Sequence, residues 1–135
     1  MDNADRPGVL ISDGHRGLRL VRDGAACEVG QPAIIKAWAG PFSGTVREVL
    51  LGGLAYFRDD LARLYDALSG DARLFGSEGS SLAVSGDGLG GVTVNVEVSG
   101  GYDPTIRLTY EIAIDQTYLP AITRALAREF ALNPA

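Results

Sequence analysis

Two stretches in the C-terminal half of the chain alternate strictly between apolar and polar residues. In residues 91–99 every second position is valine, and residues 106–114 place an apolar side chain at each even position. A period of two is typical of a strand with one buried face. The intervening residues 99–104 are rich in glycine, aspartate and proline. Such residues form turns, so the two stretches are predicted to be an antiparallel hairpin.

Two other segments repeat apolar residues at spacings of three and four. The first covers residues 54–69 and the second follows the hairpin, from about residue 119 to residue 130. Each pattern predicts an amphipathic helix with one buried stripe. Gly70 is expected to end the first helix. Asp115 or Thr117 is expected to cap the second, with Pro120 in its first turn.

Shorter apolar runs predict the remaining strands, at residues 9–12, 18–22, 33–39, 42–51, 72–75 and 82–85. The glycine-rich segment 86–91 has the composition of a phosphate loop, but it leads into a strand instead of a helix and is predicted to be a hairpin turn. No long helical crossover separates the strands. The fold class is therefore predicted as α+β, an antiparallel β-sheet with two amphipathic helices packed on one face.

The length of 135 residues fits one domain over residues 1–135, with residues 1–8 as a loose leader. Hydrophobic residues make up 46% of the chain, which is enough for a core. No apolar run approaches the ~20 residues that cross a bilayer, and the N-terminus has no signal-peptide core. We therefore expect a cytoplasmic protein without a membrane partner.

The net charge of −5 bears on possible partners. Nucleic-acid binders need a basic face, and no cluster of arginine or lysine provides one here, so no nucleic-acid partner is expected. An acidic protein suits a basic partner. The alternative is that the charge only keeps the protein in solution.

The chain contains one histidine and one cysteine, His15 and Cys27. His15 is expected in an exposed turn, and Cys27 is expected to behave as a small buried hydrophobe. We predict no catalytic residues, no metal site and no cofactor. Two alternatives remain open: a small-ligand-binding or enzymatic domain with a pocket between sheet and helices, and a structural or assembly subunit.

If both helices cover one face of the sheet, the other face carries the polar side of the C-terminal hairpin. The candidate partner-binding residues on it are Asn95, Glu97, Arg107 and Glu111. Trp38 is a further candidate, either as a core residue or as an aromatic anchor for a partner. The alternative is that this polar face is simply solvated.

The run Asp-Gln-Thr-Tyr-Leu-Pro at residues 115–120 lies between an alternating strand and a leucine-rich helix. Residues 42–44, the helix at 57–64 and the run at 82–90 fit the same pattern, which covers about residues 33–130. In these features the chain resembles the WapI-type immunity proteins, small bacterial proteins. The resemblance implies a cytoplasmic, non-catalytic binder that neutralises a cognate toxin domain. It supplies no catalytic residues and does not identify the toxin.

Overall fold

The described residues of this computed structural model, 3–100 and 103–133, form eight strands and two α-helices. The strands are β1 (Val9–Ser12), β2 (Arg16–Arg22), β3 (Gln31–Ala39), β4 (Phe42–Gly52), β5 (Ser69–Gly76), β6 (Ser81–Asp87), β7 (Gly91–Gly100) and β8 (Asp103–Asp115). Each strand pairs antiparallel with the next one along the chain, in the order β1 to β8. The α+β class, the antiparallel sheet and the hairpin of β7 and β8 are confirmed. Gly101 and Tyr102 of its predicted turn lie outside the described residues.

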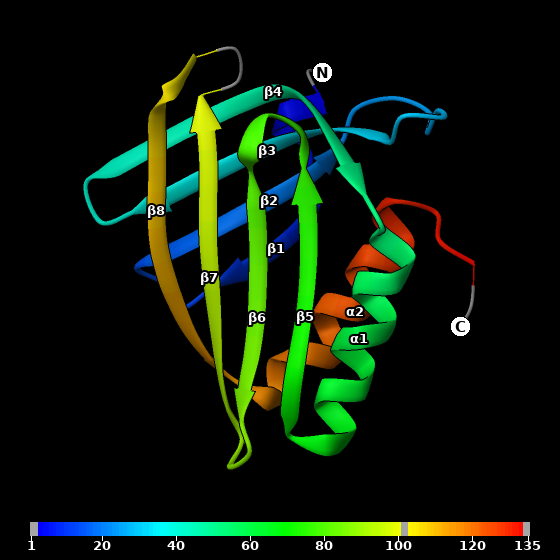
Figure 1. Cartoon of the computed structure of the whole chain (residues 1–135), viewed down its shortest axis with the longest axis vertical. Helices are drawn as coiled ribbons and strands as arrows, with labels where there is room; N and C mark the ends of the chain where they lie inside the picture. Colours follow the sequence, from blue (N-terminus) through cyan, green and yellow to red (C-terminus); the bar gives the residue numbers. More distant parts are fainter. Residues whose placement is uncertain (1–2, 101–102, 134–135) are drawn as a thin grey trace.

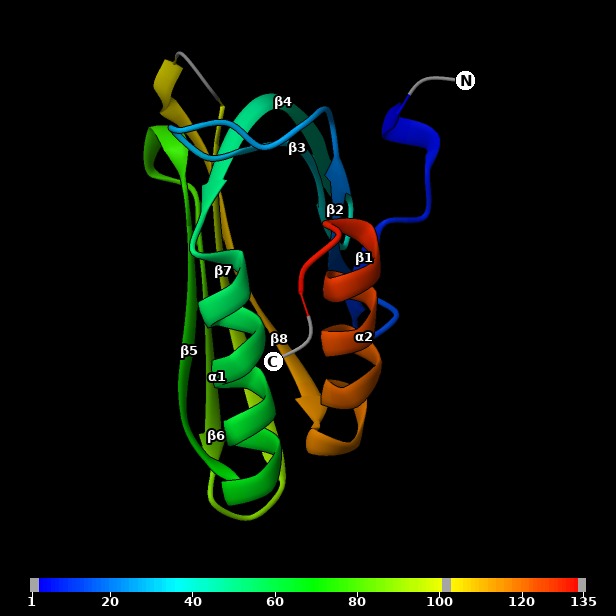
Figure 2. The same cartoon turned by 90° about the vertical axis from the view of Figure 1, so that its right-hand side faces the viewer.

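The sheet folds back on itself to make two layers. Figure 1 shows β5–β8, the front layer, running across β1–β4, the back layer, and Figure 2 shows the layers from the side. The corner lies in β4, which pairs with β5 only through its last two residues, Leu51 and Gly52. Before the corner, the register of β4 on β3 shifts, and Glu48 adopts a φ of 62°. An irregularity of this kind bends a strand and increases its twist.

Helices α1 (Leu54–Ala67) and α2 (Leu119–Glu129) lie side by side at the open side between the layers (Figure 2). α1 packs on β5, and α2 packs on β1 and on α1. Their buried stripes, which include Leu61 and Leu126, join the inward-facing residues of both layers in one hydrophobic cluster. The inner face of each layer is therefore covered by the other layer as well as by the helices. Neither described helix is long and apolar enough to cross a bilayer.

Three sequence-based expectations about the helix ends and the N-terminus need correction. Leu68, with a φ of 61°, ends α1 by donating its N–H to the carbonyl of Leu64, so Gly70 lies in β5 and does not terminate the helix. Asp115 is a cap as expected, but it accepts from the N–H of Thr117 in a 3-10 turn that precedes α2. Within the described part of the predicted leader, residues 3–8, Ala4 in the 3-10 turn Asn3–Asp5 is buried against the back layer, so this part is not loose.

Candidate partner-binding surface

Four of the five candidate residues lie together on the outward-facing side of the front layer. Asn95 on β7 is directly opposite Glu111 on β8, and Glu97 is opposite Thr109. Their neighbours in sequence on β7, the even-numbered valines, are buried in the core. Because side chains alternate between the two faces of a strand, the polar side of the hairpin must point away from the core. We call this outward-facing side of β5–β8 the outer face.

The outer face extends from the hairpin across β6 and β5. The strand register places Asn95 in a row with Ala83 and Arg73, and Glu97 in a row with Ser81 and Phe75. Phe75 is 60% exposed and is the large apolar side chain of this surface. The surface therefore combines charged, hydrogen-bonding and aromatic groups on a paired backbone.

Three of the candidate residues are charged, and two of them form an ion pair. The guanidinium of Arg107 forms an ion pair with the carboxylate of Glu97, and their side chains are 41% and 37% exposed. Glu111 is exposed and has no ion-pair partner among the described residues. The positive charge of Arg107 is thus already matched, whereas the carboxylate of Glu111 has no ion-pair partner among the described residues and the guanidinium of Arg16 binds only its main-chain oxygen.

Trp38, the fifth candidate, belongs to the back layer and not to the outer face. It alternates on β3 with the core residues Ile35 and Ala37, and is therefore on the outward-facing side of that layer. Its half-buried indole packs over Gly17, where an added Cβ would lie 2.5 Å from the ring atom Cζ2. The candidate set therefore divides between the two layers, and Trp38 does not join the other four residues.

One functional group that the sequence did not single out connects the two layers. The hydroxyl of Tyr110, on the inner side of β8, donates to the carbonyl oxygen of Gly17 in β2 at 2.5 Å. Burial raises the pKa of Tyr110 from 10.0 to about 12, against a smaller lowering effect from the main chain of Trp38. The period-two pattern marked Tyr110 as inward-facing, but only the fold shows which carbonyl it reaches.

Replacing Tyr110 with phenylalanine is expected to lower the free energy of unfolding by about 1–3 kcal/mol, because the buried carbonyl of Gly17 loses its donor. Urea unfolding at pH 7 measures this difference. Tyr65→Phe on the surface of α1 is the matched control and should change stability little. Equal stability of Tyr110→Phe and the wild type would contradict a role for the hydroxyl in joining the layers.

The same tyrosine predicts a loss of stability at high pH. Because its folded pKa is raised, the folded state keeps a proton that the unfolded chain begins to release near pH 10. Stability should therefore fall as the pH rises from about 10 to about 12 in the wild type, and fall less in Tyr110→Phe. Thermal melts across this range measure the difference, and parallel curves for the two proteins would contradict the assignment.

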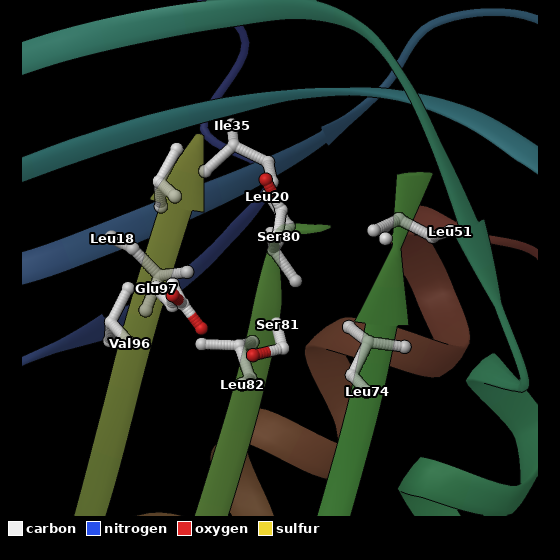
Figure 3. Close-up of a pocket in the computed structure, with 12 residues that line it drawn as sticks. Leu18, Leu20, Ile35, Leu51, Leu74, Ser80, Ser81, Leu82, Val96 and Glu97 are labelled. Carbon is white, nitrogen blue, oxygen red and sulfur yellow. The ribbon is translucent and has the colours of Figure 1, made fainter. Parts of the chain in front are cut away.

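One cavity between the two layers is too small for a ligand. Figure 3 shows a cavity lined mainly by aliphatic side chains of both layers, with Ser80, Ser81 and Glu97 among its lining residues. Its volume of about 10 Å³ has room for roughly one water molecule. Pockets for small molecules are usually about 300 Å³ or more.

A wider, open hollow of about 730 Å³ lies between the loop before β3, the start of α1 and the segment after α2. Arg58 in this hollow already contacts Asp59 and the carbonyl of Asn133. Cys27 borders the hollow and is exposed, so the expectation of a buried cysteine was wrong. The reason is that Cys27 belongs to the loop that connects β2 and β3, not to a strand.

Several acidic side chains stabilise turns. Asp13 accepts from the main-chain N–H groups of His15 and Arg16, which holds the pKa of its carboxyl below the usual value. Asp87 accepts from the N–H groups of Leu89 and Gly91 in the turn between β6 and β7, which confirms the hairpin predicted there. Across residues 3–100 and 103–133, no group of three or more metal-ligating side chains comes together.

The architecture defines an α+β protein, a folded-over antiparallel meander closed by two helices. Four of its five candidate residues form an open polar surface. The chain belongs to the WapI-like immunity protein family, whose family model matches residues 33–134. The match runs from β3 through α2 and leaves out β1 and β2, although these strands complete the back layer. No curated protein and no solved structure matches the chain.

Proposed function

We propose that this protein is a non-catalytic bacterial immunity protein that acts in the cytoplasm by binding and neutralising a cognate toxin domain. The observation that carries the proposal is the family match over most of the chain. The absence of catalysis is supported by two features of the described residues. The cavity between the layers has room for about one water, and Asp13, Asp87 and Asp115 stabilise turns.

We further propose that the toxin contacts the outer face, through Asn95, Glu97, Arg107 and Glu111. These residues stand on a hairpin whose strands pair continuously from Gly91↔Asp115 to Ser99↔Arg107. A surface held this firmly loses little conformational entropy when a partner binds. The net charge of −5 and the unpaired carboxylate of Glu111 favour a basic toxin surface, which long-range attraction would bring in faster.

The partner to test is the product of the neighbouring upstream gene, which the proposal predicts to carry a toxin domain. Expressed alone in bacteria it should stop growth, and co-expression with this protein should restore it. The two purified proteins should also elute together from a gel-filtration column as a complex. An upstream domain that is toxic, but is neither bound nor inhibited by this protein, would overturn the proposed function. Self-association without any toxin binding would instead favour an assembly subunit.

A further inference from the structure

The last strand of the sheet has a free edge. β8 spans Asp103–Asp115 and pairs with β7 on one side, while no strand among the described residues pairs with its other side. Arg107, Thr109 and Ala113 on this strand are exposed. Long, accessible edges of this kind can accept a further strand from another chain.

One contact shows which main-chain groups point to the free edge. The carbonyl oxygen of Glu111 accepts from Nη1 of Arg16 at 3.1 Å, so it points away from β7. In an antiparallel ladder, alternate residues share this orientation. The main-chain groups of Arg107, Thr109 and Ala113 therefore also point to the free edge, whereas those of Tyr110 and Ile112 point to β7.

The back layer extends beyond this edge. Figure 1 shows the turn between β3 and β4 projecting past β8. Phe42, the first residue of β4, lies four residues before Val46, so the two side chains are on the same side of the strand. Val46 packs against the core. Phe42 is thus on the inward-facing side of the back layer, yet it is 67% exposed. An extra strand beside β8 would lie over this projecting turn and cover Phe42.

Resting on the proposed function, we propose that the free edge of β8 and the projecting β3–β4 turn form a docking slot for one extended segment of the toxin domain. The segment pairs with the main chain of β8, taking the place of the Arg16 guanidinium at the carbonyl of Glu111, and so adds a strand to the front layer. Its inward-facing side chains are apolar and cover Phe42. Its outward-facing side chains include a basic residue beside Glu111, whose carboxylate has no ion-pair partner among the described residues.

Proline at Thr109 tests the slot with little disturbance of the fold. The N–H of Thr109 points to the free edge, so proline removes a donor for the toxin segment but no bond to β7. Thr109→Val is the matched control, because it changes the side chain and keeps the N–H. We expect Thr109→Pro to weaken toxin binding about tenfold or more, the loss expected for one or two hydrogen bonds, and Thr109→Val to change it little.

A second pair of variants covers the case in which the proline variant does not fold. Phe42→Ser and Phe75→Ser each replace a largely exposed phenylalanine, one at the slot and one on the outer face. Only Phe42→Ser should weaken a complex held at the slot. If Thr109→Pro and Phe42→Ser bind the toxin as well as the wild type does, the slot is not used. If only Phe75→Ser weakens binding, the toxin docks on the outer face alone.

Amide hydrogen exchange in the wild-type protein measures directly whether the main chain of β8 is covered in the complex. The amides of Arg107, Thr109 and Ala113 should exchange quickly in the free protein and become protected in the complex. Those of Tyr110 and Ile112 should be protected in both states. A toxin complex that leaves the first three amides unprotected would overturn the slot and leave the proposed function standing.

If the upstream toxin domain does not bind, the proposed function fails. The slot is then tested separately, by binding of a synthetic peptide. The probe is the blocked heptapeptide Ac-Lys-Val-Lys-Val-Lys-Val-Lys-NH2, which alternates basic and apolar side chains as the slot requires. Protection of the amides of Arg107 and Thr109 by this peptide would support the slot. The same exchange rates with and without the peptide would overturn it.

Discussion

Leu126→Ala and Leu61→Ala are each expected to lower the free energy of unfolding by about 2–5 kcal/mol. Leu126 is 0% exposed and Leu61 is 1% exposed, and both belong to the core cluster shared by the helices and the two layers. Truncation to alanine removes buried apolar surface and leaves a cavity that close-packed neighbours fill only in part. Thermal and urea unfolding of the two variants measure the loss.

Leu89→Ala is the matched control for these substitutions. Leu89 lies in the turn between β6 and β7 and is 90% exposed, so its truncation should change stability by no more than about 0.5 kcal/mol. Core variants that melt at the wild-type temperature would show that the helical stripes do not support the layers.

Charge reversal on the outer face is expected to abolish toxin neutralisation. Glu97→Arg combined with Glu111→Arg converts two carboxylates to guanidinium groups and leaves Arg107 without its ion-pair partner. A basic toxin surface would then face like charges, which costs several kcal/mol at an interface. The melting temperature should change little, because exposed ion pairs contribute only about 0–1 kcal/mol. Growth of cells that co-express the toxin measures neutralisation.

A second double variant separates local contact from overall charge. Glu28→Arg with Asp66→Arg changes the net charge by the same amount as the Glu97 and Glu111 variant. Its substitutions lie in a loop of the back layer and on the surface of α1. This variant should still protect cells, although association should be slower at low salt because the net negative charge is smaller. Full protection by the Glu97 and Glu111 variant would place the toxin on another surface.

Local patterns in the sequence determined most of the secondary structure. The alternating valines of β7 and the stripes of α1 and α2 follow directly from the periods of strands and helices, so each could be recognised without knowledge of its neighbours. Short strands and loops carried weaker patterns. Leu68 ends α1 in a left-handed conformation that favours glycine, and Cys27 lies in a loop whose exposure no period reveals.

The grouping of Asn95, Glu97, Arg107 and Glu111 on one face was determined by the sequence, because pairing two alternating strands in a hairpin aligns their polar sides. The tertiary structure alone decided what surrounds that face. The bend in β4 places Trp38 on the other layer, brings Tyr110 to Gly17, and leaves β8 with a free edge beside a projecting turn. The physical reason is that alternation specifies which side of a strand is buried, whereas the layer that buries it depends on contacts between residues far apart in the chain.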